Sequence, residues 1–269
     1  MKKLLALMFA VAVTALALSC AGDAEGKPAG TTDPERQNAG ADTMMLRVVD
    51  GAQSGALVLA DETEVYALPL DGLTLYMDGG SVDASAIENG MTAEVWYTGG
   101  VQETFPLRFK DVIAVSFSRG EDARYDLCGL YLQVLEDLWN TDEGLNGGAG
   151  MISVDLSKAP GGLTAGEKAA IAYVFAQEHG VQGLTLTFDE LREQGYLAAE
   201  KLEDGSTAYS FLEGLLFTVT PEETQENGAA VCFSAEKWRS PLGAYFFTKC
   251  TASRGEDGWE YSVGAEMIS

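Results

Sequence analysis

The chain has 269 residues and is strongly acidic, with 41 aspartates and glutamates against 17 lysines and arginines. Its net charge of −24 repels phosphate backbones and anionic lipid headgroups, so we expect neither a nucleic acid partner nor electrostatic attachment to a membrane. With one histidine and four cysteines, the chain has few of the side chains that most catalytic and metal sites use.

Residues 1–19 have the arrangement of charged and apolar side chains that is typical of a bacterial export signal. Lys2 and Lys3 precede an uncharged apolar run over residues 4–18, which is shorter than the roughly 20 residues that cross a bilayer. The run ends just before Cys20 in a sequence that resembles a lipobox, in which the cysteine becomes a diacylated N-terminus. An ordinary secretory signal with an incidental cysteine is the alternative. We predict a cleaved signal peptide, lipidation of Cys20 with palmitate, and an extracytoplasmic protein that is anchored to the cell membrane by its lipid.

The next segment, residues 20–43, is predicted to be a disordered tether. After Cys20 it contains no aromatic residue and no Val, Ile, Leu or Met. Such a composition cannot bury enough apolar surface to offset the entropy of ordering. The rest of the chain is long for one domain, and its hydrophobic periodicity changes near Gly120. We therefore predict two domains, at residues 44–119 and 120–269.

Short apolar runs, several with a period of two, alternate with turn residues between residues 44 and 118. The glycine pairs that follow Asp78 and Thr98 are placed to form tight hairpin turns. Many short strands with one brief helical insertion indicate a small closed or nearly closed β-barrel. The expected strands cover residues 46–49, 56–59, 65–68, 73–77, 93–97 and 112–117.

The later part of this segment resembles a known family. An apolar strand, a glycine turn and a Glu-Thr-Phe-Pro stretch are similar to the closing part of an OB-like domain of unknown function, found in secreted proteins and lipoproteins of Firmicutes. The resemblance implies a five-stranded barrel and a bacterium with a single membrane, and it carries over no catalytic residue. It is based on Gly90-Met91, Glu94-Val95-Trp96-Tyr97, Val101, Glu103-Thr104-Phe105-Pro106 and the strand at residues 112–117.

From residue 120 onward the pattern becomes mixed. Apolar residues at spacings of three and four predict a helix over residues 122–140, and capping boxes that begin at Thr164 and Thr187 predict two more helices. Four strand-like runs follow, so we expect an α+β domain in which three helices cover an antiparallel sheet. The last two helices are expected at residues 163–179 and 187–195, and the strands at 212–219, 229–234, 244–251 and 259–263. This region also resembles the C-terminal domains of clostridial lipoproteins, a likeness that implies no function. It is based on Lys237-Trp238-Arg239-Ser240, Gly243-Ala244 and Trp259-Glu260-Tyr261.

Patterns that indicate catalysis or metal binding are scarce. His179 ends a predicted helix, where the helix dipole explains a histidine without any catalytic role. The chain has no nucleophile elbow and no zinc-binding spacing of cysteines or histidines. The stretch from Asn140 to Asn146 departs from a calcium loop, because Leu145 stands where glycine is needed. We therefore predict no catalytic residue, no metal and no cofactor.

One candidate binding surface comprises Trp96, Tyr97, Glu103 and Phe105, on a strand and turn of the predicted barrel. OB-like barrels commonly bind ligands on their sheet face and on the adjoining loops. Core packing is the alternative for the two residues of the strand, because they point to opposite faces and only one of them needs to be exposed.

The other candidate binding surface centres on Trp238 and Arg239, in a run that combines aromatic and cationic side chains within an acidic protein. Tryptophan and arginine are the residues that most often dominate interfaces. The alternative is that Trp238 anchors the core of the domain while Arg239 pairs with a nearby acid.

Three cysteines remain if Cys20 carries the lipid. Cys232 and Cys250 lie in strand-like segments and could form a disulfide between neighbouring strands, which would leave Cys128 unpaired. Two buried free thiols are the alternative.

The predicted function is that of a non-enzymatic binding or interaction lipoprotein at the cell surface. Its partners would be the membrane, through the N-terminal lipid, and an unidentified protein or small-molecule ligand. The alternative is a cell-envelope hydrolase that uses paired carboxylates in the C-terminal domain, which the large number of acidic residues leaves open.

Overall fold

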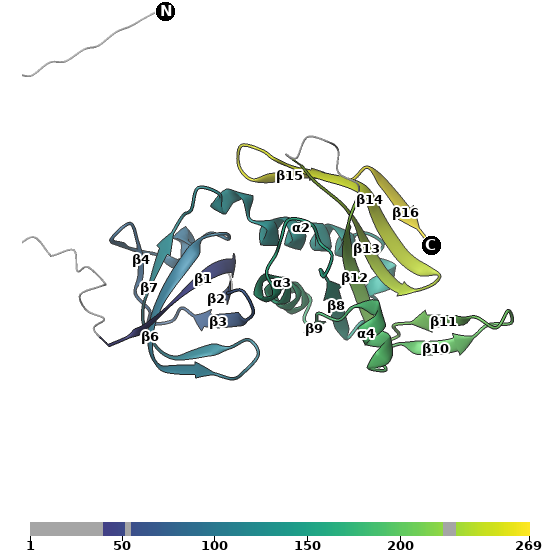
Figure 1. Cartoon of the computed structure of the whole chain (residues 1–269), viewed down its shortest axis with the longest axis horizontal. Coiled ribbons are helices and arrows are strands. Elements are labelled where there is room, and N and C mark those ends of the chain that lie inside the picture. The colour runs from purple at the N-terminus through teal and green to yellow at the C-terminus, as the bar shows by residue number, and fades with distance from the viewer. Residues whose placement is uncertain (1–39, 52–54, 223–229) are drawn as a thin grey trace, which may run out of the picture. The chain divides into compact units, whose positions relative to one another are not determined.

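The computed structural model describes residues 40–51, 55–222 and 230–269 (Figure 1). The fold is mainly β, with 47% strand and 20% helix. The predicted signal peptide, Cys20 and most of the predicted tether lie outside the described residues. Within the described ranges, no helix has the length and apolar character needed to cross a membrane.

The first part of the described chain forms a seven-stranded sheet that curls into a half-barrel. Its strands, in spatial order, are β3 (Val65–Pro69), β2 (Ala56–Ala60), β1 (Asp42–Asp50), β6 (Thr92–Gln102), β7 (Arg108–Ser118), β4 (Leu75–Met77) and β5 (Gly80–Val82). Strands are present at all the expected positions between residues 44 and 118, and β5 is additional. The last two residues of the predicted tether belong to β1, where Asp42 pairs with Tyr97 and Thr43 pairs with Trp96.

The two predicted glycine turns have different outcomes. Asp78 and Gly79 both have positive φ, 51° and 76°, and they form the two-residue turn between β4 and β5. Gly99 and Gly100 form no hairpin turn, because β6 continues past them and the register with β7 shifts there, as in a β-bulge. The prediction of a tight turn at these glycines is wrong, and the loop that joins β6 to β7 is residues 103–107.

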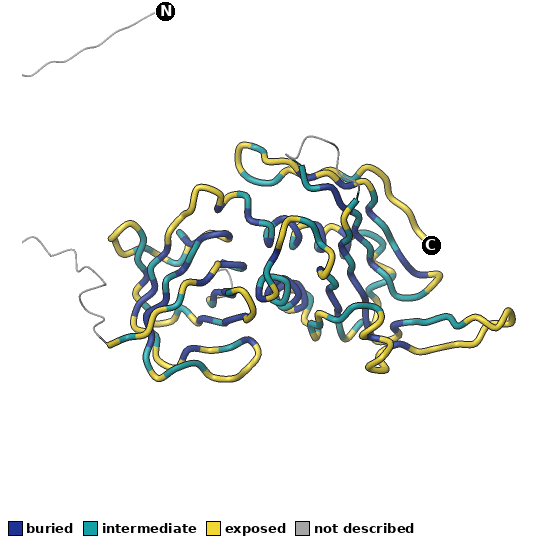
Figure 2. The backbone as a smooth tube through the Cα atoms, viewed as in Figure 1, coloured by how far each residue is buried: buried dark blue, intermediate teal, exposed yellow. Residues whose placement is uncertain are grey.

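The second sheet is mixed, whereas the sequence predicted an antiparallel one. In spatial order it contains β15 (Trp259–Ser262), β14 (Gly243–Arg254), β13 (Ala230–Ser240), β12 (Gly214–Pro221), β8 (Met151–Asp155) and β9 (Gln182–Leu184), while β16 (Ala265–Ile268) also pairs with β14. The four predicted strand runs correspond to β12, β13, β14 and β15, which pair antiparallel. β8 pairs parallel with β12, and β9 pairs parallel with β8. β10 (Ala198–Lys201) and β11 (Thr207–Ser210) form a separate ribbon, in which β10 is exposed and β11 is partly buried (Figure 2).

Helices occupy the connections between these strands. Side-chain caps define where the longer ones begin, since Asp126 accepts a hydrogen bond from the Gly129 amide and complete capping boxes begin at Thr164 and Thr187. The cap at Asp126 explains why the first helix starts five residues later than predicted. The α-helices are α2 (Leu127–Asn140), α3 (Ala165–Glu178) and α4 (Phe188–Glu193), and the 3₁₀ helices are η2 (Ala84–Ala86), η3 (Ala123–Tyr125) and η4 (Glu143–Asn146).

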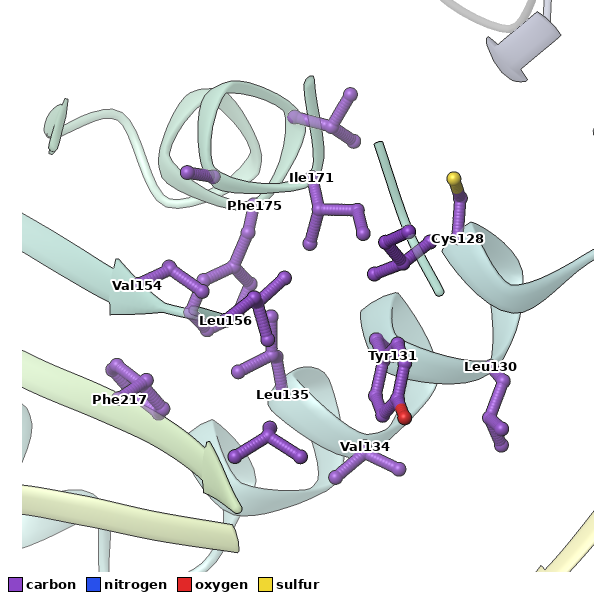
Figure 3. Packing of buried hydrophobic residues seen from close by; sticks show 14 of the residues in the cluster. Cys128, Leu130, Tyr131, Val134, Leu135, Val154, Leu156, Ile171, Phe175 and Phe217 are labelled. Atoms are coloured by element: carbon purple, nitrogen blue, oxygen red, sulfur yellow. The ribbon is translucent and has the colours of Figure 1, made fainter. Parts of the chain in front are cut away.

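The main core forms around α3, which contacts β1, β2 and β3 of the first sheet and β8 and β9 of the second. Figure 3 shows Ile171 and Phe175 of α3 pointing toward Leu135 of α2 and Phe217 of β12. Val58 of the first sheet belongs to the same buried cluster. Because protein surrounds α3, its apolar residues are not confined to one face.

The turn between β2 and β3 packs against the N-terminus of α3. The Gly166 amide donates to the Glu62 carbonyl at 3.2 Å, and Thr164 Oγ1 donates to the Asp61 carbonyl at 3.1 Å. A Cβ atom on Gly166 would lie 2.4 Å from the Asp61 oxygen, so only glycine permits this approach. The predicted domain boundary at residue 119 falls between β7 and η3, but the core and these contacts cross it.

Candidate functional site

Three aromatic side chains from distant parts of the chain surround a small pocket. Phe105 lies in the loop between β6 and β7 and is 67% exposed. Its ring meets that of Tyr173 on α3 edge to face, with centroids 5.9 Å apart. Tyr196, just after α4, is the third and is 37% exposed.

The pocket has a volume of about 270 Å³ and is mainly apolar. α3 forms one wall of the pocket. Residues from β9 to just after α4 form another. Besides the tyrosine hydroxyls, Thr185 and Gln194 contribute the polar side chains of the lining, and no lining residue is charged. The lining residues are Phe105, Ala169, Ala172, Tyr173, Gly183, Leu184, Thr185, Leu186, Gln194 and Tyr196.

Hydrogen bonds hold the Phe105 loop in place. The Leu107 amide donates to the Val65 carbonyl at 2.8 Å, and the Leu107 carbonyl accepts from the Ala67 amide at 2.9 Å, so the end of the loop is fastened to β3. Thr104 Oγ1 donates to the Pro106 carbonyl at 2.7 Å, and Pro106 is buried. The exposed ring of Phe105 therefore stands on an ordered loop.

The opposite wall is held by a buried serine. Ser153 Oγ on β8 donates to the Leu186 carbonyl at 2.7 Å and accepts from the Leu186 amide at 3.0 Å. Gly183 lets α3 lie close, because a Cβ atom there would lie 3.0 Å from both the Ala172 carbonyl oxygen and Ala176 Cβ. Both sides of the pocket are thus positioned by contacts within the fold.

No family model, curated protein or solved structure matches this chain. The interpretation of the pocket is therefore based on its own geometry.

Of the first predicted surface, only Phe105 lines this pocket. Glu103 is exposed in the same loop, but Trp96 and Tyr97 are buried, at 6% and 9% exposure. The Tyr97 ring packs against Phe109 with centroids 4.8 Å apart, inside the core of the first sheet. The alternative of core packing is therefore correct for both residues of the strand.

The second predicted surface has a structural explanation. Trp238 packs against Phe188 of α4, with ring centroids 5.2 Å apart. The sequence suggested that Arg239 pairs with a nearby acid, but among the described residues it has no such partner. It donates instead to the carbonyls of Leu145 and Gly147 at 2.7 Å and to that of Leu212 at 2.8 Å. These contacts fasten the loop after α2 to the second sheet.

Lys237, which directly precedes Trp238 in the same run, is fully buried. Its Nζ donates to the carbonyls of Trp139 and Asp142 and to Asn146 Oδ1 at 3.1 to 3.3 Å, and also to the Thr141 carbonyl. A cation here complements the negative end of α2. Burial lowers the pKa of Lys237 to about 8, although nearby acidic side chains oppose that shift.

The three cysteines of the described chain are free and buried. Phe233 on β13 pairs with Cys250 on β14, whereas Cys232 pairs with Thr251. Because successive side chains of a strand point to opposite faces, Cys232 and Cys250 lie on opposite faces of the sheet. The structure therefore has free thiols and not the predicted disulfide.

A further pocket, of about 380 Å³, is lined by Asp122, Asp126 and Glu167, and the last two of these carboxylates lie beside Arg47. Arg47 Nε lies 2.9 Å from Glu167 Oε1, and Arg47 Nη1 lies 3.6 Å from Asp126 Oδ1. Burial raises the pKa of Asp126, against the opposing effects of the Gly129 amide and Arg47. Both carboxylates also cap helices, since Asp126 accepts from the Gly129 amide and Glu167 from the Thr164 amide, each at 2.9 Å.

The single histidine also has structural partners. His179 Nε2 lies 2.9 Å from Glu136 Oε2, and the imidazole stacks on Trp139 with centroids 3.9 Å apart. Among the described residues, no group of three or more histidine, cysteine, aspartate or glutamate side chains is arranged to hold a metal ion.

Proposed function

We propose that this protein is a lipid-anchored, extracytoplasmic binding protein without catalytic activity, whose ligand inserts an apolar group between Phe105 and Tyr173. The observation that carries the proposal is the exposure of Phe105 on a loop that hydrogen bonds hold in place. An exposed aromatic side chain beside a small apolar pocket is typical of a binding site.

We further propose that the half-barrel is OB-like. The antiparallel pairings of β1 with β2 and β6, of β2 with β3, and of β6 with β7 support this. So does the parallel bridge between Tyr66 on β3 and Leu107 just before β7, which links the remaining pair of the five strands. In this arrangement Phe105 lies in the loop between the fourth and fifth barrel strands, one of the loops with which OB folds bind ligands.

The lipid anchor is proposed from the sequence around Cys20, which lies outside the described residues. Metabolic labelling of producing cells with a palmitate analogue tests it, with Cys20→Ala as the comparison. We expect label on the wild-type protein and none on the variant, because the diacylated cysteine is the attachment point. Equal labelling of the two proteins would contradict the anchor.

Ligand-observed NMR with indole and with p-cresol tests the pocket. Each probe is the size of one aromatic side chain, so we expect saturation transfer from the wild-type protein and a strong reduction with Phe105→Ala. Leu242→Ala is the matched control, because Leu242 is 89% exposed and does not line the pocket. Equal signals from the wild type and Phe105→Ala would overturn the proposed site.

The alternative of a cell-envelope hydrolase would use Asp126 and Glu167, which share a pocket around Arg47. Glycoside hydrolysis uses two carboxyl groups that lie in different environments, and burial raises the pKa of Asp126. The capping contacts of both carboxylates favour the structural explanation. Release of reducing ends from peptidoglycan by the wild type, and its loss in Glu167→Gln, would favour the hydrolase.

A further inference from the structure

We infer that the ligand of the pocket is an extended, basic polypeptide segment that pairs with the open edge of β9 and inserts one apolar side chain between Phe105 and Tyr173. This inference rests on the proposed function, because it uses the same pocket. It adds the chemical class of the ligand and the way in which the ligand lies on the protein.

The size of the pocket is the first argument. Pockets that enclose small-molecule ligands have volumes of roughly 300 to 1,000 Å³. At about 270 Å³, this pocket is smaller and has room for one aromatic or aliphatic side chain. The remainder of a tightly bound ligand would have to lie outside the pocket, on the neighbouring surface.

The neighbouring surface includes the open edge of a sheet. Among the strands that the structure describes, β9 is the last of the second sheet and pairs only with β8. The Gln182 amide donates to the Gly150 carbonyl, and Leu186 bonds to Ser153. Because alternate residues of a parallel edge strand bond to the neighbouring strand, Gly183 directs its backbone groups toward the open edge. Thr185 follows directly after the end of this strand.

The edge and the pocket adjoin, since Gly183 and Thr185 both line the pocket. A polypeptide that adds as a strand to such an edge forms main-chain hydrogen bonds, while pockets select its side chains. Because β9 has only three residues, its open edge offers few hydrogen bonds, which limits non-specific pairing with other strands. The aromatic pocket would supply the additional affinity and the specificity.

The negative charge of the protein indicates that its partner is positively charged. The protein carries a net charge of −24, and the exposed Glu103 is close in sequence to the pocket residue Phe105. Lysine and arginine on either side of the inserted residue would complement this surface and speed association. A second copy of this acidic chain would be repelled.

Segments of the chain itself do not fit the pocket. Beyond the predicted signal peptide, the segments that the structure does not describe are residues 20–39, 52–54 and 223–229. None of them contains an aromatic residue, Val, Ile, Leu or Met. They have no side chain suited to fill an apolar pocket between two aromatic rings, so we assign the site to another protein.

Selection from a random peptide library displayed on phage tests the inference. The mature, full-length protein is the target, and binders to Phe105→Ala are removed beforehand. We expect enrichment of peptides that carry an aromatic or aliphatic residue flanked by lysine or arginine. No enrichment over Phe105→Ala would overturn the peptide inference, whereas binding of indole and p-cresol would decide the proposed pocket independently.

Backbone N-methylation of the best enriched peptide tests strand addition. Two forms are synthesised, with methyl groups on alternate amides in one register or the other, and their dissociation constants are measured by calorimetry. In an added strand only alternate amides face the partner, so one form should bind at least about tenfold more weakly than the other. Equal binding of the two forms would overturn strand addition, even if Phe105→Ala abolished binding and so supported the pocket.

The protein side of the same contact can be changed at Thr185. Thr185 follows β9 and lines the pocket, so a bound strand that extends past Leu184 would meet its amide. Thr185→Pro removes that amide and should weaken peptide binding by about tenfold, whereas Thr185→Ala keeps the amide and should bind as the wild type does. Circular dichroism shows whether Thr185→Pro folds. If it does not fold, the pair of N-methylated peptides decides the question with the unaltered protein.

Discussion

Arg47 of β1 forms an ion pair with Glu167, the acid of the capping box of α3, with 2.9 Å between Nε and Oε1. Arg47 Nη1 also donates to the Gly90 carbonyl at 3.2 Å. The Glu167 side chain is only 13% exposed, so few water molecules can replace Arg47 as its partner. The contact joins the first sheet to the helix that organises the main core.

We expect Arg47→Met to lower the free energy of unfolding by about 1 to 3 kcal/mol, because the mostly buried carboxylate of Glu167 loses its charged partner. Urea denaturation measures the effect. In the Glu167→Gln background the capping box is retained, since glutamine also serves at this position, and Arg47→Met should then cost much less. Equal costs in both backgrounds would contradict a role for the ion pair.

The close approach of Gly166 to the Asp61 carbonyl leads to a second prediction, about the stability of a Gly166 variant. Alanine is normally the better helix residue by about 1 kcal/mol. At Gly166 the added methyl group would lie 2.4 Å from a backbone oxygen, so we expect Gly166→Ala to destabilise the protein by about 2 kcal/mol or more. Gly129→Ala on α2 is the control, because its nearest contact is an ordinary 3.6 Å and its stability should rise. Thermal unfolding of both variants shows whether the steric contact or the helix propensity of alanine dominates at Gly166.

Asp61 should make stability depend on pH. Burial works against the shift, but hydrogen bonds from the Thr63 and Glu64 amides and from the Tyr66 hydroxyl lower the pKa of the Asp61 carboxyl below 3.8. A lowered pKa in the folded state stabilises the protein above pH 3.8, and this contribution is lost as the pH falls through the lowered pKa. Asp61→Asn should therefore be less stable than the wild type at pH 6, and the difference should shrink below pH 3.8. A difference that does not change with pH would contradict this account of the turn.

The buried Lys237 should be essential for stability. Lys237→Met has a similar length but leaves the carbonyls at the end of α2 without their donor, so we expect a loss of about 3 kcal/mol or more in urea denaturation. Lys158→Met, at an exposed position, is the control and should change stability by less than about 0.5 kcal/mol. A Lys237→Met protein as stable as the control would show that these hydrogen bonds contribute little.

Features with local causes could be predicted from the sequence. The capping boxes at Thr164 and Thr187 depend on residues three positions apart, and the Asp78-Gly79 turn depends on two neighbours. The strands β8 and β9 could not be recognised in the same way, because they are short and their pairing partners are far apart in the chain. Without these two strands the sequence predicted an antiparallel sheet, whereas the sheet in the structure is mixed.

The candidate site could be predicted only in part. The sequence predicts Phe105 in a turn of the barrel, as part of a binding surface, but nothing nearby in the sequence places Tyr173 or Tyr196 beside it. Tyr173 lies within an apolar helix, and Tyr196 follows a glycine at the end of α4, so neither has a local pattern that indicates binding. The aromatic and cationic composition around Trp238 and Arg239 predicted a binding surface. In the structure Trp238 packs on Phe188 and Arg239 donates to the Leu145 carbonyl, so both side chains hold the fold together.

The most direct test of the proposed function is a crystal structure of the mature protein grown with saturating indole. The account predicts electron density for the indole ring between Phe105 and Tyr173, and the loss of that density in crystals of Phe105→Ala. Indole bound only elsewhere, or an empty pocket at saturation, would contradict it.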